Sequence, residues 1–204
     1  MAFLRLVARE NVTAERDDRD LAAAARGGDE VAFAELVRRH QAGVRRCAAR
    51  ILSDAEEARD IAQLAFIRAW ENLAKYDPSW SFSTWLYRIG TNLAIDVLRS
   101  RDSRERTHTA HLRLVGDSVG ASAPRDLAEV EVKRIFAELA RELPPTQRAA
   151  FVLREVEGLD TSEVAAVLGC SEATVRNHVF QARVVLRKEL AARYPEYLPR
   201  GGGR

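Results

Sequence analysis

Apolar residues recur three and four positions apart along most of the chain, and no stretch shows sustained alternation of apolar with polar residues. The first spacing lines one face of an α-helix, whereas alternation marks a half-buried strand. In segment 84–101 the apolar positions form one face and Arg88, Asn92 and Arg99 lie on the other. The sequence therefore predicts an all-α protein.

Clusters of glycine and proline divide this helical pattern. The longest interruption, 102–125, is rich in Arg, Ser, Thr and Gly and has little periodic apolar content, so we interpret it as a flexible linker between two small helical domains. The full expected organisation is a disordered N-terminal arm at 1–19, a first domain at 20–101, the linker at 102–125, a second domain at 126–194 and a C-terminal tail at 195–204.

The charge is nearly balanced, with a formal net charge of +2, so the bulk composition does not by itself indicate nucleic-acid binding. The two cysteines, Cys47 and Cys170, lie far apart in apolar-periodic stretches, which favours reduced thiols in a cytoplasmic protein. No apolar run approaches the roughly twenty residues that span a bilayer, so no direct membrane insertion is expected. No metal site and no cofactor are expected.

The most specific local pattern is a helix-turn-helix over Leu159–Arg187. Asp160 and Glu163 have the spacing of a capping box, and Gly169 suits the left-handed residue that ends a helix. Ser171 is a good N-cap for the second helix, whose inward stripe is predicted to be Val175, Val179, Ala182 and Leu186. A short helix, a glycine turn and a long helix together are typical of a DNA-reading motif.

The opposite face of that second helix carries side chains that suit base recognition. Arginine pairs with guanine, and asparagine and glutamine pair with adenine, in the major groove. The candidate DNA-reading residues are Ser171, Thr174, Arg176, Asn177, Phe180, Gln181 and Arg183. A helix-turn-helix alone suits a dimeric repressor or activator equally well, so that alternative stays open at this point.

An enzyme is not expected. Ser, His and acidic residues are scattered through predicted helices, without a glycine elbow, metal-ligand spacing or a phosphate-binding loop.

Segments 54–70 (DAEEARDIAQLAFIRAW) and 82–96 (FSTWLYRIGTNLAID) resemble region 2 of the extracytoplasmic-function (ECF) group of bacterial sigma-70 factors. The C-terminal LPP at 143–145 and TVRNHV at 174–179 are similar to region 4 of the same family. The resemblance runs from about residue 20 to 190. It implies an RNA polymerase sigma factor that directs the core enzyme to promoters and assists DNA melting.

The resemblance also implies partners. Asp60 and Gln63 would face the clamp helices of the polymerase β′ subunit, and the β flap, promoter DNA and an anti-sigma factor would be further partners. Asp60 and Gln63 share a helical face at i, i+3. Leu64 departs from the family's pattern, which commonly has Glu there, and this implies the loss of one acidic contact.

By the same resemblance, the loop after Lys75 and the helix that follows it would bind the melted −10 promoter element, while the C-terminal helix would read the −35 element as duplex. Melted strands are held by stacking on aromatic rings while cations follow the backbone. The candidate −10 residues are Trp80, Phe82, Arg88, Asn92 and Arg99, and Arg101 continues the basic run.

Overall fold

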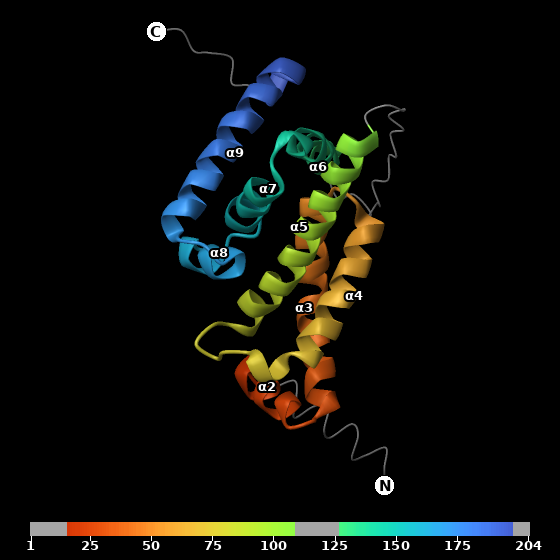
Figure 1. Ribbon diagram of the computed structural model, residues 1–204, viewed down its shortest axis with the longest axis vertical. Helices are drawn as coiled ribbons and strands as arrows, with labels where there is room; N and C mark the ends of the chain where they lie inside the picture. Colours follow the sequence, from red (N-terminus) through yellow and green to blue (C-terminus); the bar gives the residue numbers. More distant parts are fainter. Residues whose placement is uncertain (1–15, 109–126, 198–204) are drawn as a thin grey trace.

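A computed structural model describes residues 16–108 and 127–197, and every regular element in these two ranges is helical (Figure 1). The predicted all-α class is confirmed. In the described part of the chain, no helix combines the length and the apolar character that crossing a membrane requires.

The N-terminal block consists of the described helices up to residue 108. Its elements are α2 (Asp18–Arg26), α3 (Glu30–Leu52), α4 (Ala55–Glu71), the 3₁₀ turn η1 (Leu73–Lys75) and α5 (Phe82–His108). Helices α3, α4 and α5 pack side by side along most of their length, and α2 lies across one end of them (Figure 1).

Short polar side chains begin the helices of this block. The Asp29 carboxylate accepts hydrogen bonds from the backbone N–H groups of Val31 and Ala32 and caps α3, and Asp54 caps α4 in the same way. Ser53 lies between them with a left-handed φ of 55°, which turns the chain sharply from α3 into α4.

The C-terminal block consists of the helices from residue 127 onward. Its elements are α6 (Leu127–Leu139), the 3₁₀ turn η2 (Ala140–Glu142), α7 (Pro145–Phe151), the π-helical turn η3 (Val152–Val156), α8 (Thr161–Leu168), α9 (Glu172–Arg193) and the 3₁₀ turn η4 (Pro195–Tyr197). Helix α8 lies against α5, whereas α9 lies on the outer side of α7 and α8 (Figure 1).

The buried side chains of the two blocks form one continuous apolar cluster, which includes Leu86 of α5 and Val164 of α8. The two blocks are therefore docked on one another in this structure.

The helical elements cross the predicted domain boundaries at three places. Helix α2 begins at Asp18, inside the predicted arm, and α5 continues past Arg101 to His108, inside the predicted linker. The turn η4 lies inside the predicted tail. Where α5 passes the predicted boundary, the Arg101 guanidinium pairs with Glu57 and lies 3.6 Å from Asp54 of α4. The rest of the predicted arm, linker and tail, at 1–15, 109–126 and 198–204, lies outside the described residues.

Candidate nucleic-acid and polymerase interfaces

The helix-turn-helix of the C-terminal block is built as the sequence predicts. The backbone N–H of Glu163 donates to Asp160 Oδ1 at 2.8 Å, and the backbone N–H of Asp160 donates to Glu163 Oε2 at 2.9 Å, so the capping box is complete. Gly169 ends α8 with a φ of 64°, and Ser171 caps α9 by accepting a hydrogen bond from the Thr174 N–H at 3.1 Å. These local contacts fix the turn between the two helices.

The inward stripe of α9 holds this helix on the block. Val175, Val179 and Ala182 are buried, and Leu186 is half-buried. The opposite stripe of α9 therefore points away from α7 and α8, at the outer edge of the molecule (Figure 1).

Six of the seven candidate DNA-reading residues are exposed: Ser171, Arg176, Asn177, Phe180, Gln181 and Arg183. Thr174 is half-buried, and its hydroxyl lies 2.8 Å from the Ser171 hydroxyl, which makes it part of the helix cap. Phe180, at 60% exposure, is a large apolar ring with no place in the core. Such a ring suits contact with a thymine methyl group.

Two arginines of this face are held by carboxylates. Arg176 donates to Glu172 one turn earlier in α9 at 3.1 Å, and Arg183 donates to Glu155 of η3 at 2.7 Å. Both pairs are solvent-accessible, so the guanidiniums can exchange these partners for bases or phosphates at little cost.

The N-terminal block brings most of the candidate −10 residues to one surface. Arg88, Asn92 and Arg99 are exposed on α5, and Trp80 is 40% exposed in the loop that precedes this helix. This surface combines an accessible aromatic ring with cations and an amide.

Phe82 does not belong to that surface, and its prediction as a DNA-contacting residue is wrong. Its side chain is 1% exposed and lies among the rings of His40, Tyr76 and Trp85, with centroids 5.6, 5.6 and 5.7 Å away. The reason is that α5 begins at Phe82 rather than at Thr84, which turns this ring into the core. The neighbouring Trp85 packs against the same core.

Arg101 is also engaged within the protein. Its guanidinium pairs with Glu57 and donates to the Leu52 backbone oxygen at 3.4 Å. Arg101 therefore connects α5 to the α3–α4 corner and does not extend the basic run predicted to begin at Arg99.

Asp60 and Gln63 are both exposed on one face of α4, as expected. Beside them the structure contains a groove of about 800 Å³ between α3 and α4 that sequence reasoning missed. Apolar and aromatic side chains line much of it, including Phe33, Ile67 and Trp70, and Gln63 also lines it. The Phe33 and Trp70 ring centroids are 4.8 Å apart.

A sequence signal for this groove exists. Leu64, Ile67 and Trp70 follow one another at three-residue spacing and form a second apolar stripe on α4, beside the stripe that enters the core. These three side chains are 38%, 47% and 39% exposed, so they are free to contact a partner.

Both cysteines are free thiols. Burial raises the pKa of the Cys47 thiol and, to a smaller extent, that of Cys170, so neither is activated as a nucleophile. Within residues 16–108 and 127–197, no three His, Cys, Asp or Glu side chains gather in a way that could hold a metal ion.

The sequence matches two family descriptions. Residues 36–104 match sigma-70 region 2, and residues 133–186 match sigma-70 region 4. The ECF RNA polymerase sigma factor SigW of Bacillus subtilis is 33% identical over 173 residues, which cover 80% of this chain and 91% of that protein. The RNA polymerase sigma-H factor of Pseudomonas aeruginosa is 32% identical and covers 86% of this chain and 95% of its own length.

A solved structure of CnrH in complex with the cytosolic domain of CnrY matches with a TM-score of 0.65 and 31% identity, covering 86% of this chain and 98% of that chain. The fold and the exposed face of α9 define a helical, DNA-binding transcription factor. The chain belongs to the ECF group of the sigma-70 family of RNA polymerase sigma factors. It is thus a promoter-recognition subunit, and these matches do not support a dimeric repressor.

Proposed function

We propose that this sigma factor divides promoter recognition between its two blocks while core RNA polymerase holds them at the required spacing. Helix α9 reads the −35 element as duplex DNA, the face around α5 captures the melted −10 strand, and α4 binds the core enzyme. The observation that carries this proposal is the polar outer face of α9, set over a buried inner stripe in a complete helix-turn-helix.

The −35 assignment is supported by the chemistry of the exposed side chains. Arg176, Asn177 and Gln181 offer donors and acceptors that match base edges in the major groove, and Phe180 offers an apolar contact. Ser171 and Thr174 lie at the N-terminal end of α9, where backbone N–H groups favour a phosphate.

The −10 assignment is supported by Trp80 together with Arg88, Asn92 and Arg99. An exposed indole can stack on a base, and the two arginines can follow the backbone of a separated strand. Phe82 would support this surface indirectly. Its ring packs on Tyr76 and Trp85 and so fixes the position of the first turn of α5.

The core-binding assignment rests on Asp60 and Gln63 and on the apolar groove beside them. An interface with an apolar centre and a polar rim is typical of stable protein association. Ile67 and Trp70 would form the apolar centre, with Asp60 and Gln63 at the rim. Leu64, at 38% exposure, would extend the apolar centre in place of an acidic contact.

We also propose an anti-sigma factor as a regulatory partner, because the matched CnrH structure is a complex with the cytosolic domain of CnrY. The proposed place of action is the cytoplasm, where the polymerase works, and the proposed role is recognition rather than catalysis.

In vitro transcription with sigma-free core polymerase and a promoter library tests the proposal. We expect transcripts from a subset of templates that share a −35 and a −10 element, and loss of most of this activity in Arg176→Ala and Gln181→Ala. Failure of the chain to co-elute with core polymerase, or to start any transcript, would overturn the proposed function.

A further inference from the structure

The cations along α9 differ in whether a carboxylate holds them. Arg176 and Arg183 each make an ion pair, with N–O distances of 3.1 Å and 2.7 Å. Arg187 and Lys188 are exposed as well, but neither makes an ion pair with another residue in the described ranges. The two cations that carboxylates hold are therefore the ones nearer to the N-terminal end of the helix.

The position of a cation along α9 decides which part of DNA it can reach. The N-terminal turns of a recognition helix enter the major groove and contact base edges. Arg176 lies in the second turn of α9, whereas Arg187 lies about 16 Å further along the helix axis. Arg187 is therefore placed for the DNA backbone, and the cations held by carboxylates are the ones nearer to the bases.

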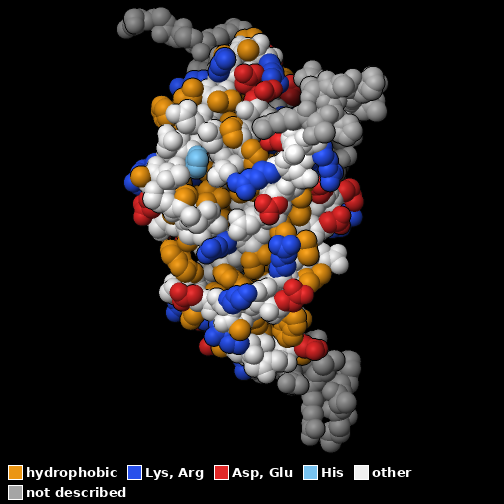
Figure 2. All heavy atoms as spheres, in the orientation of Figure 1, with side chains coloured by type: hydrophobic (Ala, Val, Ile, Leu, Met, Phe, Trp, Pro, Cys, Tyr) orange, Lys and Arg blue, Asp and Glu red, His pale blue; other side chains and the backbone are white. Residues whose placement is uncertain are grey.

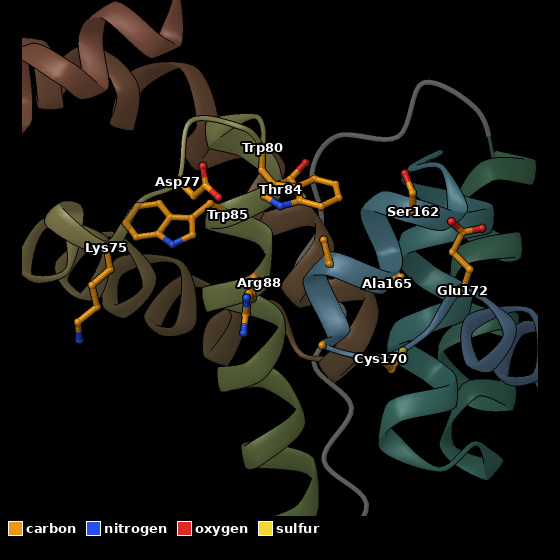
Figure 3. Close-up of a pocket in the computed structure, with 12 residues that line it drawn as sticks. Lys75, Asp77, Trp80, Thr84, Trp85, Arg88, Ser162, Ala165, Cys170 and Glu172 are labelled. Carbon is orange, nitrogen blue, oxygen red and sulfur yellow. The ribbon is translucent and has the colours of Figure 1, made fainter.

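Glu172 holds Arg176 within α9 itself. It lies one helical turn earlier, and its Oε2 accepts a hydrogen bond from Arg176 Nη1 at 3.1 Å. Glu172 also lines a pocket of about 570 Å³ together with Lys75 and Arg88 of the N-terminal block, and Figure 3 shows it extending from the start of α9. Although these two cations line the same pocket, the ion pair that Glu172 makes in the described part of the chain is with Arg176.

Glu155 holds Arg183 from a different element. It belongs to the π-helical turn η3, in which the backbone N–H of Glu157 donates to the Val152 carbonyl oxygen, five residues earlier, at 2.9 Å. Val152 and Leu153 are buried, so this turn is fixed on the core and presents the Glu155 carboxylate to α9. Turns of this kind are frequent at functional sites.

Neither carboxylate uses all the donors of its arginine. A guanidinium has five N–H groups. Glu172 accepts from Nη1 of Arg176, and Glu155 accepts from Nη2 of Arg183. The two arginine side chains are 64% and 59% exposed, so their remaining N–H groups can still form the two parallel hydrogen bonds that a guanine accepts.

The carboxylates also favour a base over a phosphate as the partner of each arginine. An exposed ion pair contributes little by itself, so either DNA group can replace the carboxylate. A phosphate that did so would lie beside a negative charge that stays attached to the protein, and the two charges would repel each other. A guanine edge carries no net charge and meets no such repulsion.

We propose that Glu155 and Glu172 are positioning residues for −35 recognition, which direct Arg183 and Arg176 to base edges and away from the DNA backbone. They raise the ratio between the affinity for the correct −35 element and the affinity for other DNA. This inference rests on the proposed function, because it takes α9 as the helix that reads the −35 element.

Glu155→Gln and Glu172→Gln test the proposal in the full-length chain bound to core polymerase. Both changes remove a charge and keep the length of the side chain. Competition between a promoter recovered from the library and the same promoter with a scrambled −35 element measures the affinity ratio. We expect each variant to lower this ratio by about 3-fold or more, mainly through tighter binding of the scrambled promoter. The double variant should lower it by about 10-fold.

Salt dependence is a second readout, which a purely structural role of the two acids would not change. An arginine that is released to bind a phosphate should steepen the plot of log affinity against log salt for the scrambled promoter by about one unit. Glu155→Asp and Glu172→Asp keep the negative charge, so they should keep most of the wild-type ratio and the wild-type slope.

Glu131→Gln is the matched control. Glu131 pairs with Arg134 at 2.7 Å on α6, so its loss makes the same change of net charge without altering the outer face of α9. This variant should keep the wild-type affinity ratio. Circular dichroism confirms that each variant is folded before its binding is compared.

Three outcomes would overturn the inference: an unchanged ratio in folded Glu155→Gln and Glu172→Gln, an equal loss of binding to both promoters, or the same fall in Glu131→Gln. The proposed function is tested separately by Arg176→Ala. If Arg176→Ala removes the promoter preference while the glutamine variants keep it, the −35 assignment stands and only this inference fails. If Arg176→Ala keeps the preference, the −35 assignment of α9 itself fails.

Discussion

The Glu35 carboxylate on α3 accepts hydrogen bonds from two arginines, at 2.6 Å from Arg38 Nη2 and 2.7 Å from Arg39 Nε. Hydrogen bonds from Arg38 first, and from Arg39, hold the pKa of Glu35 at about 2, below its usual 4.5, against the opposing effect of burial. Because folding lowers this pKa, the ionised carboxylate stabilises the folded state above pH 4.5. The contribution is lost as the pH falls from 4.5 toward 2.

Thermal unfolding of the wild type and of Glu35→Gln at pH 7 and pH 3 checks this expectation. The glutamine variant should melt several degrees lower at pH 7, and the difference should shrink at pH 3. An equal difference at both pH values would show that the ionised Glu35 does not stabilise the fold.

Gln181, exposed on α9, is expected to read an adenine of the −35 element. Gln181→Arg should therefore shift the preferred base at one −35 position from adenine to guanine, with a discrimination of about 10-fold or more. Selection from the promoter library measures the shift. Lys188 is exposed on the flank of the same helix, where we expect it to contact a phosphate and no base. Lys188→Ala should therefore weaken binding to all promoters alike.

The role of some single residues could be predicted from the sequence, whereas the role of others could not. The cap residues Asp160 and Ser171 could be identified from the chain alone, because a cap depends on neighbours within three positions. Phe82 and Arg101 could not be assigned. Each has a partner more than forty residues away, His40 for Phe82 and Glu57 for Arg101. The tertiary fold therefore decides whether these side chains face DNA or the core.

At the scale of elements, the turn between α8 and α9 depends on the left-handed backbone of Gly169, whose φ is 64°. A Cβ at this position would meet no heavy atom within 4 Å, so the expected cost of Gly169→Ala is conformational. It should lower stability by about 1 kcal/mol and the melting temperature by about 3 °C.

Gly169→Asn serves as its control, because asparagine tolerates this conformation better than alanine does. The alanine variant should therefore unfold first in a thermal melt. A melting temperature that is the same for alanine, asparagine and glycine would mean that the turn does not limit stability.

The groove between α3 and α4 is the proposed binding site for core polymerase. Ile67→Glu places a charge on an apolar side chain that is 47% exposed, so folding should be retained while core binding weakens by at least about 10-fold, or about 1.4 kcal/mol. Competition for core polymerase against the wild type measures this. Val132→Glu is the matched control on α6, where the side chain is 58% exposed, and should bind as the wild type does.

At the scale of the whole molecule, acidic and basic side chains are interspersed over the face in Figure 2, and the formal net charge is only +2. Non-specific DNA binding depends on the number of phosphates that a basic surface neutralises. The free protein should therefore bind duplex DNA more weakly than about 10 μM in moderate salt. Fluorescence anisotropy with a labelled promoter duplex measures it, and tight sequence-specific binding without polymerase would contradict the expectation.

The docking of the blocks is the part of the fold that the sequence does not predict. Each block has an apolar stripe that suits a small helical domain, and nothing in the spacing of residues near Leu86 or Val164 says which surface the stripe will meet. The ion pair of Arg50 with Glu157 joins residues more than a hundred positions apart. Such pairings follow from the assembled shape and not from local pattern.

The two carboxylate oxygens of Glu163 accept hydrogen bonds from different parts of the protein. Oε2 closes the capping box of α8, while Oε1 accepts the Thr84 hydroxyl of the other block. A change that draws this carboxylate away from both partners would therefore remove the capping box of α8 and a polar contact between α8 and α5 at the same time.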